Sequence, residues 1–140
     1  LQEWNQRRAL LAELYDQEFA EKGLEEVKPV TRATNSVSFP HLYVIRVKGR
    51  KPSAGSAQRN ERRNSLIAFL GAKGIETGIH YEHPLHLQPA FRRFGDERGD
   101  FPNAEIACDE ILSLPMHPFL SRDKVHRVVN TTAKFFRSSR

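Results

Sequence analysis

The end of the sequence carries the pattern that most restricts how this chain can fold. Its apolar positions recur at intervals of three and four residues, the spacing of one face of an α-helix: Val125, Val128, Val129, Thr132, Phe135 and Phe136. Ser121 stands where a residue that caps the start of such a helix is expected. An almost unbroken apolar face must be buried, so the rest of the chain has to supply a partner surface.

Three other segments have helical patterns. Leu1–Lys22 is amphipathic and is followed by Gly23, a typical stop signal. Its apolar positions are Trp4, Leu11, Leu14, Tyr15 and Phe19. Asn60–Lys73 predicts a second helix with Asn60 as its cap, and Asn103–Glu110 predicts a third that begins after Pro102.

Short extended segments separate these helices. His41–Val47 is the clearest strand because β-branched and aromatic residues dominate it, and Ile75–Tyr81 and Ile111–Leu114 predict two more. Val27–Phe39 is irregular and has room for one short strand. The order predicts an α+β fold: a small, mainly antiparallel three-stranded sheet covered by helices on one face. The 140 residues fit one domain, without an internal repeat.

Composition narrows the class of protein further. With 39% hydrophobic residues the chain can build a core, but no apolar run approaches the roughly 18 residues of a membrane-spanning helix. Cys108 is the single cysteine, which fits a reducing cytoplasm and a role as a small core residue. Leu1 is not an initiator methionine, and no signal peptide follows it. We therefore expect a cytoplasmic protein whose sequence here begins within a longer chain.

The formal net charge is +5, and the basic residues gather in Arg46–Arg63. Such a run is usually a solvated loop, and residues 49–56 within it are rich in Gly, Pro and Ser and predict disorder. A basic run can also attract an anion, so a free-standing module that binds nucleic acid or another anion stays open as an alternative function.

The polar residues most suggestive of chemistry lie in Gly74–Phe91, GIETGIHYEHPLHLQPAF. His80, His83 and His86 have a spacing that could ligate a metal ion, although Pro84 between them disrupts helical geometry. The alternative is a ligand pocket: titratable groups at a strand end, with Tyr81 beside His80, are a common lining for one. No G-x-S-x-G, P-loop or G-x-G-x-x-G motif indicates another active site.

The same segment resembles the G-I-x-T-x-x-H-Y-x-x-P-L-H-x-Q-x-A-[FY] motif of the DegT/DnrJ/StrS family of sugar aminotransferases. Other motifs follow in the family's order. LQEWNQRRALLAELYDQ resembles its helix entering the small domain, PHLYVIRV its H-x-[FY]-[VI]-I-R strand, and the segment from GDFPNAEIACDEILSLPMHPFL onward its closing region. The resemblance covers nearly the whole chain.

This resemblance implies the C-terminal small domain of a fold type I enzyme that depends on pyridoxal phosphate, with residues 1–22 as an interdomain helix. Family members form homodimers and transfer an amino group, from glutamate, to a nucleotide-linked keto sugar. Some relatives are dehydratases with histidine in place of the cofactor lysine. The large domain that supplies the lysine and the phosphate cup is absent, and the lysines present do not lie in the lysine motif: Lys22, Lys28, Lys48, Lys51, Lys73, Lys124 and Lys134.

By this resemblance the chain contributes substrate contacts and no catalytic residue. His80 and Tyr81 match the family's His-Tyr pair, and His86 matches the histidine after Pro-Leu. His41 and Arg46 are further candidates. Imidazole, phenol and guanidinium groups can orient anionic substrates such as a nucleotide sugar. Glu82 stands where many members have proline, so a carboxylate would alter the charge near the substrate.

Overall fold

The computed structural model describes residues 1–31, 38, 40–49 and 60–138. Its elements follow in the order α1 (Gln2–Lys22), β1 (Val27–Pro29), β2 (Tyr43–Val47), α2 (Glu61–Ala72), the 3-10 turns η1 (Leu85–Leu87) and η2 (Pro89–Phe94), α3 (Pro102–Glu110), β3 (Ile111–Leu114) and α4 (Arg122–Ser138). The three strands form an antiparallel sheet in the order β1-β2-β3. The predicted α+β class with a small three-stranded sheet is confirmed.

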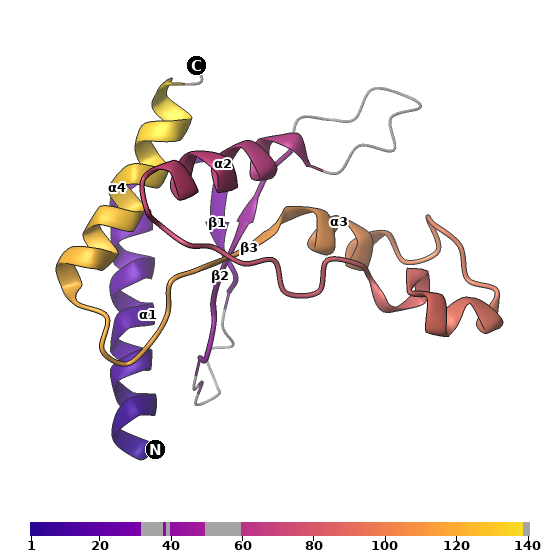
Figure 1. Ribbon diagram of the computed structural model, residues 1–140, viewed down its shortest axis with the longest axis horizontal. Coiled ribbons are helices and arrows are strands. Elements are labelled where there is room, and N and C mark those ends of the chain that lie inside the picture. Colours follow the sequence, from indigo (N-terminus) through magenta and orange to yellow (C-terminus); the bar gives the residue numbers. More distant parts are fainter. Residues whose placement is uncertain (32–37, 39, 50–59, 139–140) are drawn as a thin grey trace.

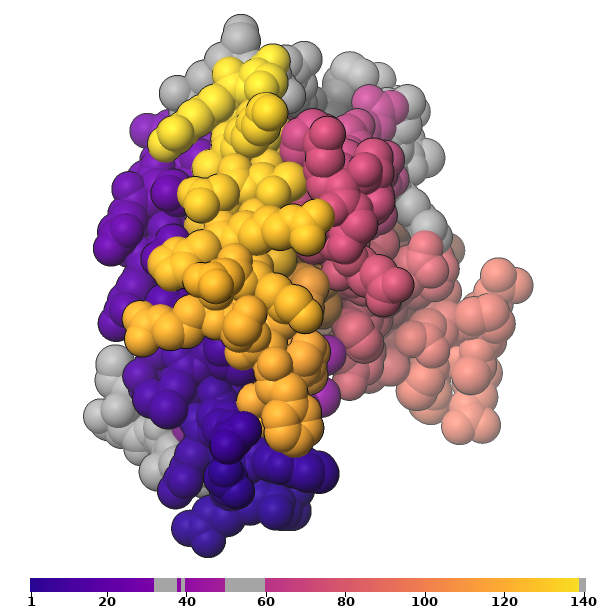
Figure 2. Space-filling model, turned by 60° about the vertical axis from the view of Figure 1, so that its left-hand side comes forward, coloured from indigo at the N-terminus to yellow at the C-terminus, as the bar shows by residue number. Residues whose placement is uncertain are grey.

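Helices α1, α4 and α2 share the main core with one face of the sheet. Every second residue of β2, Tyr43, Ile45 and Val47, points into this core. Leu114 and Leu112 of β3, which pair with Tyr43 and Ile45, point into it as well. The predicted stripe of α4 is buried there, and Figure 2 shows α4 lying between α1 and α2. A stack of three aromatic rings, Tyr15, Phe19 and Tyr43, joins α1 to β2.

Helix α3 departs from the expectation that all helices cover one face. It lies on the other side of the sheet from α1 and α4 (Figure 1). Glu110 at the end of α3 forms an ion pair with Arg46 of β2. The side chains of Ile45 and Val47, on either side of Arg46, point into the main core, so that of Arg46 points away from it. The alternation of side chains along a strand places Val44, Arg46 and Ser113 on this opposite face of the sheet.

The strand predicted at Ile75–Tyr81 is wrong. Only Gly78 pairs with the sheet, through an isolated bridge to Ser113 beside β3. The chain leaves the sheet because Tyr81 adopts a left-handed conformation with φ 65°, and Pro84 follows three residues later. The third strand is instead Val27–Pro29, where Pro29 is tolerated because β1 lies at the sheet edge.

Local signals at helix ends are mostly confirmed. The side chain of Asn60 accepts a hydrogen bond from the backbone N–H of Arg63 at 3.1 Å, as its predicted capping role requires. Its amide also donates to the carbonyl of Val47 at 2.6 Å, which fastens α2 to the end of β2. Gly23 ends α1 in a left-handed conformation with φ 60°. Within the described residues, no helix has both the length and the apolarity to cross a membrane.

Candidate functional site

The imidazole of His80 lies on the face of the sheet away from α1 and α4. Its Nδ1 is 2.9 Å from the hydroxyl oxygen of Ser113, whose side chain alternates with the core residues Leu112 and Leu114. Ser113 is only 5% exposed, whereas His80 is exposed. The predicted substrate contact is thus anchored at one ring nitrogen and open to solvent elsewhere.

Tyr81 follows at the point where the chain turns out of the sheet. Among the described residues it is the one non-glycine position with positive φ, a conformation that is costly for an aromatic residue. Its side chain remains 77% exposed. The turn therefore presents a phenol to solvent at the residue that follows His80.

A groove of about 560 Å³ begins at Tyr81. The segment after Tyr81 forms one wall and α3 the other, with Leu85, Phe91, Phe101 and Ile111 among its apolar lining. The groove is also lined by five residues with titratable side chains: Tyr81, His83, His86, Asp96 and Cys108. Burial, with a contribution from Asp109, raises the pKa of Cys108, which keeps that thiol protonated at neutral pH, as a small core residue would be.

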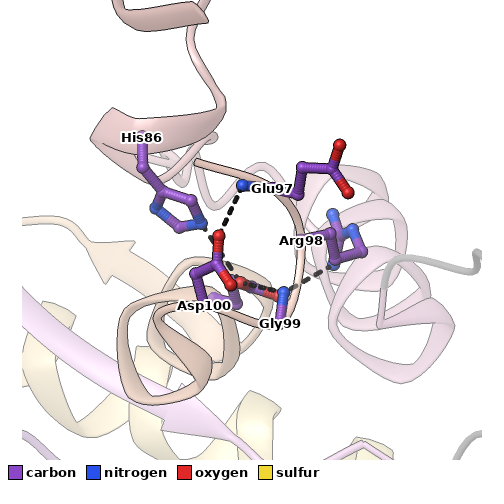
Figure 3. A network of polar contacts seen from close by, with 6 residues as sticks. His86, Glu97, Arg98, Gly99 and Asp100 are labelled. Carbon is purple, nitrogen blue, oxygen red and sulfur yellow. Dashed lines mark hydrogen bonds and ion pairs between the residues drawn. The ribbon is translucent and has the colours of Figure 1, made fainter. Parts of the chain in front are cut away.

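His86 has a different environment from His80. Its side chain is buried, its Nε2 is 3.1 Å from Oε1 of Glu105, and its ring lies 4.8 Å from that of Phe101. Glu105 also accepts the backbone N–H of Gly99 at 2.7 Å and pairs with Arg98 at 3.6 Å (Figure 3). The bond from Gly99, supported by His86, Phe101 and Arg98, lowers the pKa of Glu105.

Of the further candidates, the structure brings Arg46 to the same face and leaves His41 apart. Arg46 pairs in register with Ile111, which lines the groove, and its guanidinium holds Glu110 at 2.7 Å. His41 is exposed and precedes Tyr43, at the end of β2 that pairs with Leu114. Any anion that reaches Arg46 must therefore compete with Glu110.

The three histidines do not converge as the metal hypothesis requires. His80 is bound to Ser113, and His86 to Glu105. Over the described ranges, no three side chains of His, Cys, Asp or Glu are grouped so that they could hold a metal ion. The spacing in sequence does not bring the three rings together, because His80 lies against the sheet while His86 lies against α3.

The basic run Arg46–Arg63 lies partly outside the described residues, and so does most of its predicted loop. The described arginines of the run are engaged within the chain. Arg46 pairs with Glu110, Arg62 pairs with Glu26 at 3.3 Å, and the buried Arg63 donates to the carbonyl of Cys108 at 2.9 Å. Arg63 thereby satisfies a carbonyl near the end of α3 that the helix itself leaves without a partner. Part of the basic charge of this run therefore serves contacts within the folded chain.

Pyridoxal phosphate does not fit a site built from this chain's described residues. The cofactor needs a lysine positioned at its aldehyde. The described lysines, Lys22, Lys28, Lys48, Lys73, Lys124 and Lys134, do not line the groove beside Tyr81. Five of them are exposed, which suits surface charges.

Three residues with clear roles at this site were not singled out by the sequence. Gly78 pairs with Ser113, Ser113 binds His80, and Glu105 holds His86. Ser113 and Glu105 lie inside the motifs LSLP and FPNAE that carried the family resemblance, which was an available signal. Gly78 had none beyond its position two residues before a histidine at a strand end.

Known proteins resemble this chain along almost its whole length. A sequence profile of the DegT/DnrJ/EryC1/StrS aminotransferase family matches residues 1–133. The erythromycin biosynthesis sensory transduction protein EryC1 of Saccharopolyspora erythraea is 36% identical over 94% of this chain and 32% of its own length. The dTDP-3-amino-3,4,6-trideoxy-alpha-D-glucose transaminase of Streptomyces venezuelae is 33% identical over 96% of this chain and 32% of its own.

Solved structures have the same fold. DesV of S. venezuelae, in complex with a ketimine intermediate, superposes with a TM-score of 0.78 at 33% identity and covers 94% of this chain and 31% of its own. The PLP form of Spr1654 from Streptococcus pneumoniae gives 0.75 at 31% identity over 96% of this chain and 32% of its own. The chain spans about a third of the length of the curated relatives it matches. On this similarity, the chain belongs to the DegT/DnrJ/EryC1/StrS aminotransferase family.

Proposed function

We propose that this chain is the C-terminal small domain of an aminotransferase that depends on pyridoxal phosphate and aminates a nucleotide-linked keto sugar, with glutamate as the amino donor. The similarity of residues 1–133 to the family carries this proposal. A relative whose name describes a dTDP-sugar transaminase supports the substrate class. The exposed His80 and Tyr81 beside a groove support a role of this chain in substrate contact.

The work of the enzyme is divided between this chain and residues outside it. The cofactor, its lysine and its phosphate site belong to the rest of the protein, since none of the lysines that the structure describes lines the groove. Helix α1 connects the two parts, and the intact protein is a homodimer. This chain alone is inactive. Whether the intact protein aminates or dehydrates its substrate depends on the residue at the cofactor-lysine position, which lies outside these 140 residues.

Within this division, His80 and Tyr81 orient the sugar nucleotide. Both can donate a hydrogen bond to a hydroxyl or phosphate oxygen, and such bonds to charged groups are worth about 1.5–3 kcal/mol. His86 instead supports the groove wall through Glu105, because it is buried against that carboxylate. Glu82 is exposed in the same turn and adds negative charge, which disfavours an additional phosphate close to it.

Kinetics of the intact protein that contains this region test the proposal. With glutamate, pyridoxal phosphate and a panel of keto-sugar nucleotides, amination is followed by mass spectrometry. His80→Ala and Tyr81→Phe should each lower kcat/KM for the sugar about 10- to 100-fold, the equivalent of one lost bond to a charged group. His117→Ala, an exposed histidine outside this segment, serves as the matched control. Absence of amination with every keto-sugar nucleotide contradicts the proposal.

The division of labour has its own test on the 140-residue chain. Incubation with pyridoxal phosphate and reduction with borohydride should leave no stoichiometric adduct on a single lysine, because no lysine of the described ranges lines the groove. Peptide mapping distinguishes scattered low-level labelling from one dominant site. A single fully labelled lysine shows that this chain does hold the cofactor.

A further inference from the structure

The pairing of Gly78 with Ser113 leaves a space on the face of the sheet that points away from α1 and α4. Their backbones exchange two hydrogen bonds, from Gly78 N–H to the Ser113 carbonyl at 3.0 Å and from Ser113 N–H to the Gly78 carbonyl at 2.8 Å. In such a pair both side chains project from the same face. Gly78 has no side chain, so the position opposite the Ser113 hydroxyl is vacant.

The imidazole of His80 occupies this vacancy. A Cβ atom placed on Gly78 would lie 3.1 Å from Cε1 and 3.6 Å from Nδ1 of His80. The first distance is tighter than an ordinary van der Waals contact, so the ring would have to move. Gly78 is not in a left-handed conformation. The glycine is therefore required here for space rather than for backbone freedom, and an alanine would disturb the ring alone.

Ser113 supplies the second constraint on the ring. Its hydroxyl lies 2.9 Å from Nδ1 of His80. Because Ser113 is a buried residue of β3, this hydroxyl has little freedom to follow a moving ring. Nε2 of His80 has no hydrogen-bond partner within the described part of the chain. The ring is thus fixed against the sheet at Nδ1 and Cε1, and its second nitrogen remains available.

A hydroxyl suits this task in both charge states of the imidazole. When His80 is neutral, Ser113 can donate its hydrogen to Nδ1, which leaves the ring hydrogen on Nε2. When His80 is protonated, Nδ1 donates to the same hydroxyl oxygen and Nε2 again carries a hydrogen. In both of these arrangements Nε2 carries a hydrogen that it can donate to a phosphate or hydroxyl oxygen of a substrate, whereas the neutral tautomer with its hydrogen on Nδ1 would leave Nε2 as an acceptor.

We infer that Gly78 and Ser113 are positioning residues for His80, which hold its imidazole so that Nε2–H is presented to an oxygen of the nucleotide sugar. This inference rests on the proposed function for the identity of that ligand. The arrangement of the ring itself does not depend on it. Fixing an exposed side chain before the substrate binds removes an ordering cost from binding, and a small misplacement of such a group can cost up to about 100-fold in rate.

Nuclear magnetic resonance of the 140-residue chain tests the arrangement without substrate. Hε1 of His80 should show a nuclear Overhauser effect to an Hα of Gly78 in the unaltered protein. Ser113→Ala should weaken or abolish that signal, and Gly78→Ala should displace the Hε1 resonance of His80. Ser65→Ala and Gly71→Ala are matched controls, because both positions lie exposed in α2, and nothing lies within 4 Å of a Cβ at Gly71. A cross-peak that persists unchanged in Ser113→Ala overturns the inference.

A double-mutant cycle in the intact protein tests the consequence. Ser113→Ala and Gly78→Ala should each lower kcat/KM for the sugar about 10-fold, a loss that corresponds to one poorly placed hydrogen bond. In a His80→Ala background neither change should have a further effect, because the ring that they position is absent. Equal losses in both backgrounds show that these residues act independently of His80 and refute their positioning role.

The two proposals fail in different ways. If the cross-peak disappears in Ser113→Ala but His80→Ala leaves the sugar kinetics unchanged, the substrate contact proposed for His80 is wrong and the inference about its orientation toward substrate falls with it. If His80→Ala impairs the kinetics while Ser113→Ala changes neither the cross-peak nor the rate, the proposed function stands and the positioning role is rejected. Unfolding midpoints of all variants identify any loss of fold.

Discussion

At the scale of single residues, Tyr81 shows how this site departs from what stability alone would favour. Its backbone has a φ of 65°, while its side chain is 77% exposed and buries little surface in return. A left-handed conformation at a residue other than glycine costs of order 1–3 kcal/mol. Strain at an exposed position next to His80 is consistent with a side chain retained for binding.

This view predicts that Tyr81→Asn stabilises the chain. Asparagine tolerates the left-handed region far better than tyrosine, so the free energy of unfolding should rise by about 1 kcal/mol. Urea denaturation followed by circular dichroism measures the change. Tyr81→Phe keeps the strain and should leave stability within about 0.5 kcal/mol of the unaltered protein. A less stable Tyr81→Asn variant would mean that the phenol makes a stabilising contact that outweighs the backbone strain.

At the scale of elements, the side chain of Glu105 links three segments: η1, the loop before α3, and α3 itself. It receives His86 from η1, the N–H of Gly99 from the preceding loop, and Arg98 from the same loop, all against α3 (Figure 3). The carboxylate form makes these interactions, and the bond from Gly99 is the main reason its pKa is lowered. One ionised side chain therefore takes part in holding the groove wall together.

The lowered pKa of Glu105 predicts a pH dependence with a definite sign. A carboxyl group with a lower pKa in the folded state contributes stability above its unfolded pKa, and this contribution is lost as pH falls below about 4.3 toward the folded value. Glu105→Gln cannot titrate, so the decline of the unfolding free energy in this acid range should be shallower than in the unaltered chain.

The measurement is a series of urea unfolding curves between about pH 3 and 6, across the ordinary glutamate pKa. Glu21→Gln, an exposed position in α1, controls for the loss of one negative charge. Parallel pH profiles for Glu105→Gln and the unaltered chain would show that the network around Glu105 contributes nothing to acid sensitivity.

At the scale of the whole molecule, α4 packs against several other elements of the core. It packs between α1 and α2 (Figure 2), and its buried side chains belong to the same hydrophobic cluster as those of the sheet. Phe136 is only 1% exposed, and the guanidinium of Arg62 lies 5.0 Å from its ring. The segment from Tyr81 to Phe101, by contrast, projects from the opposite side of the sheet, so the site and the main core are spatially separate (Figure 1).

This separation predicts unequal effects of two similar truncations. Phe136→Ala should destabilise the fold by about 3–5 kcal/mol, the usual cost of removing a buried phenylalanine. Phe119→Ala removes the same side chain from a position that is 64% exposed and should cost less than about 1 kcal/mol. Thermal and urea unfolding measure both. Comparable losses for the two variants would indicate that the loop before α4 is part of the core.

Much of the fold could be predicted from the sequence, but less of the site. The α4 stripe, the cap at Asn60 and the strand before Val47 are signals carried by residues close together in the chain. Extended segments depend on partners far away, which is why Val27–Pro29 joined the sheet and Ile75–Tyr81 did so only at Gly78. The substrate roles of His80, Tyr81, His86, His41 and Arg46 remain predictions that kinetics must test.

By itself the sequence determined the helices, the fold class and the family, because apolar periodicity and ordered motifs are properties of neighbouring residues. Only the tertiary structure decided that His80 rests on Ser113 and that His86 turns inward to Glu105. His80 and Ser113 are 33 positions apart. Their meeting depends on sheet register, and a shift of one residue would turn the serine to the other face. The register is set by the packing of the whole sheet, and a pattern of neighbouring residues in the sequence does not reveal that packing.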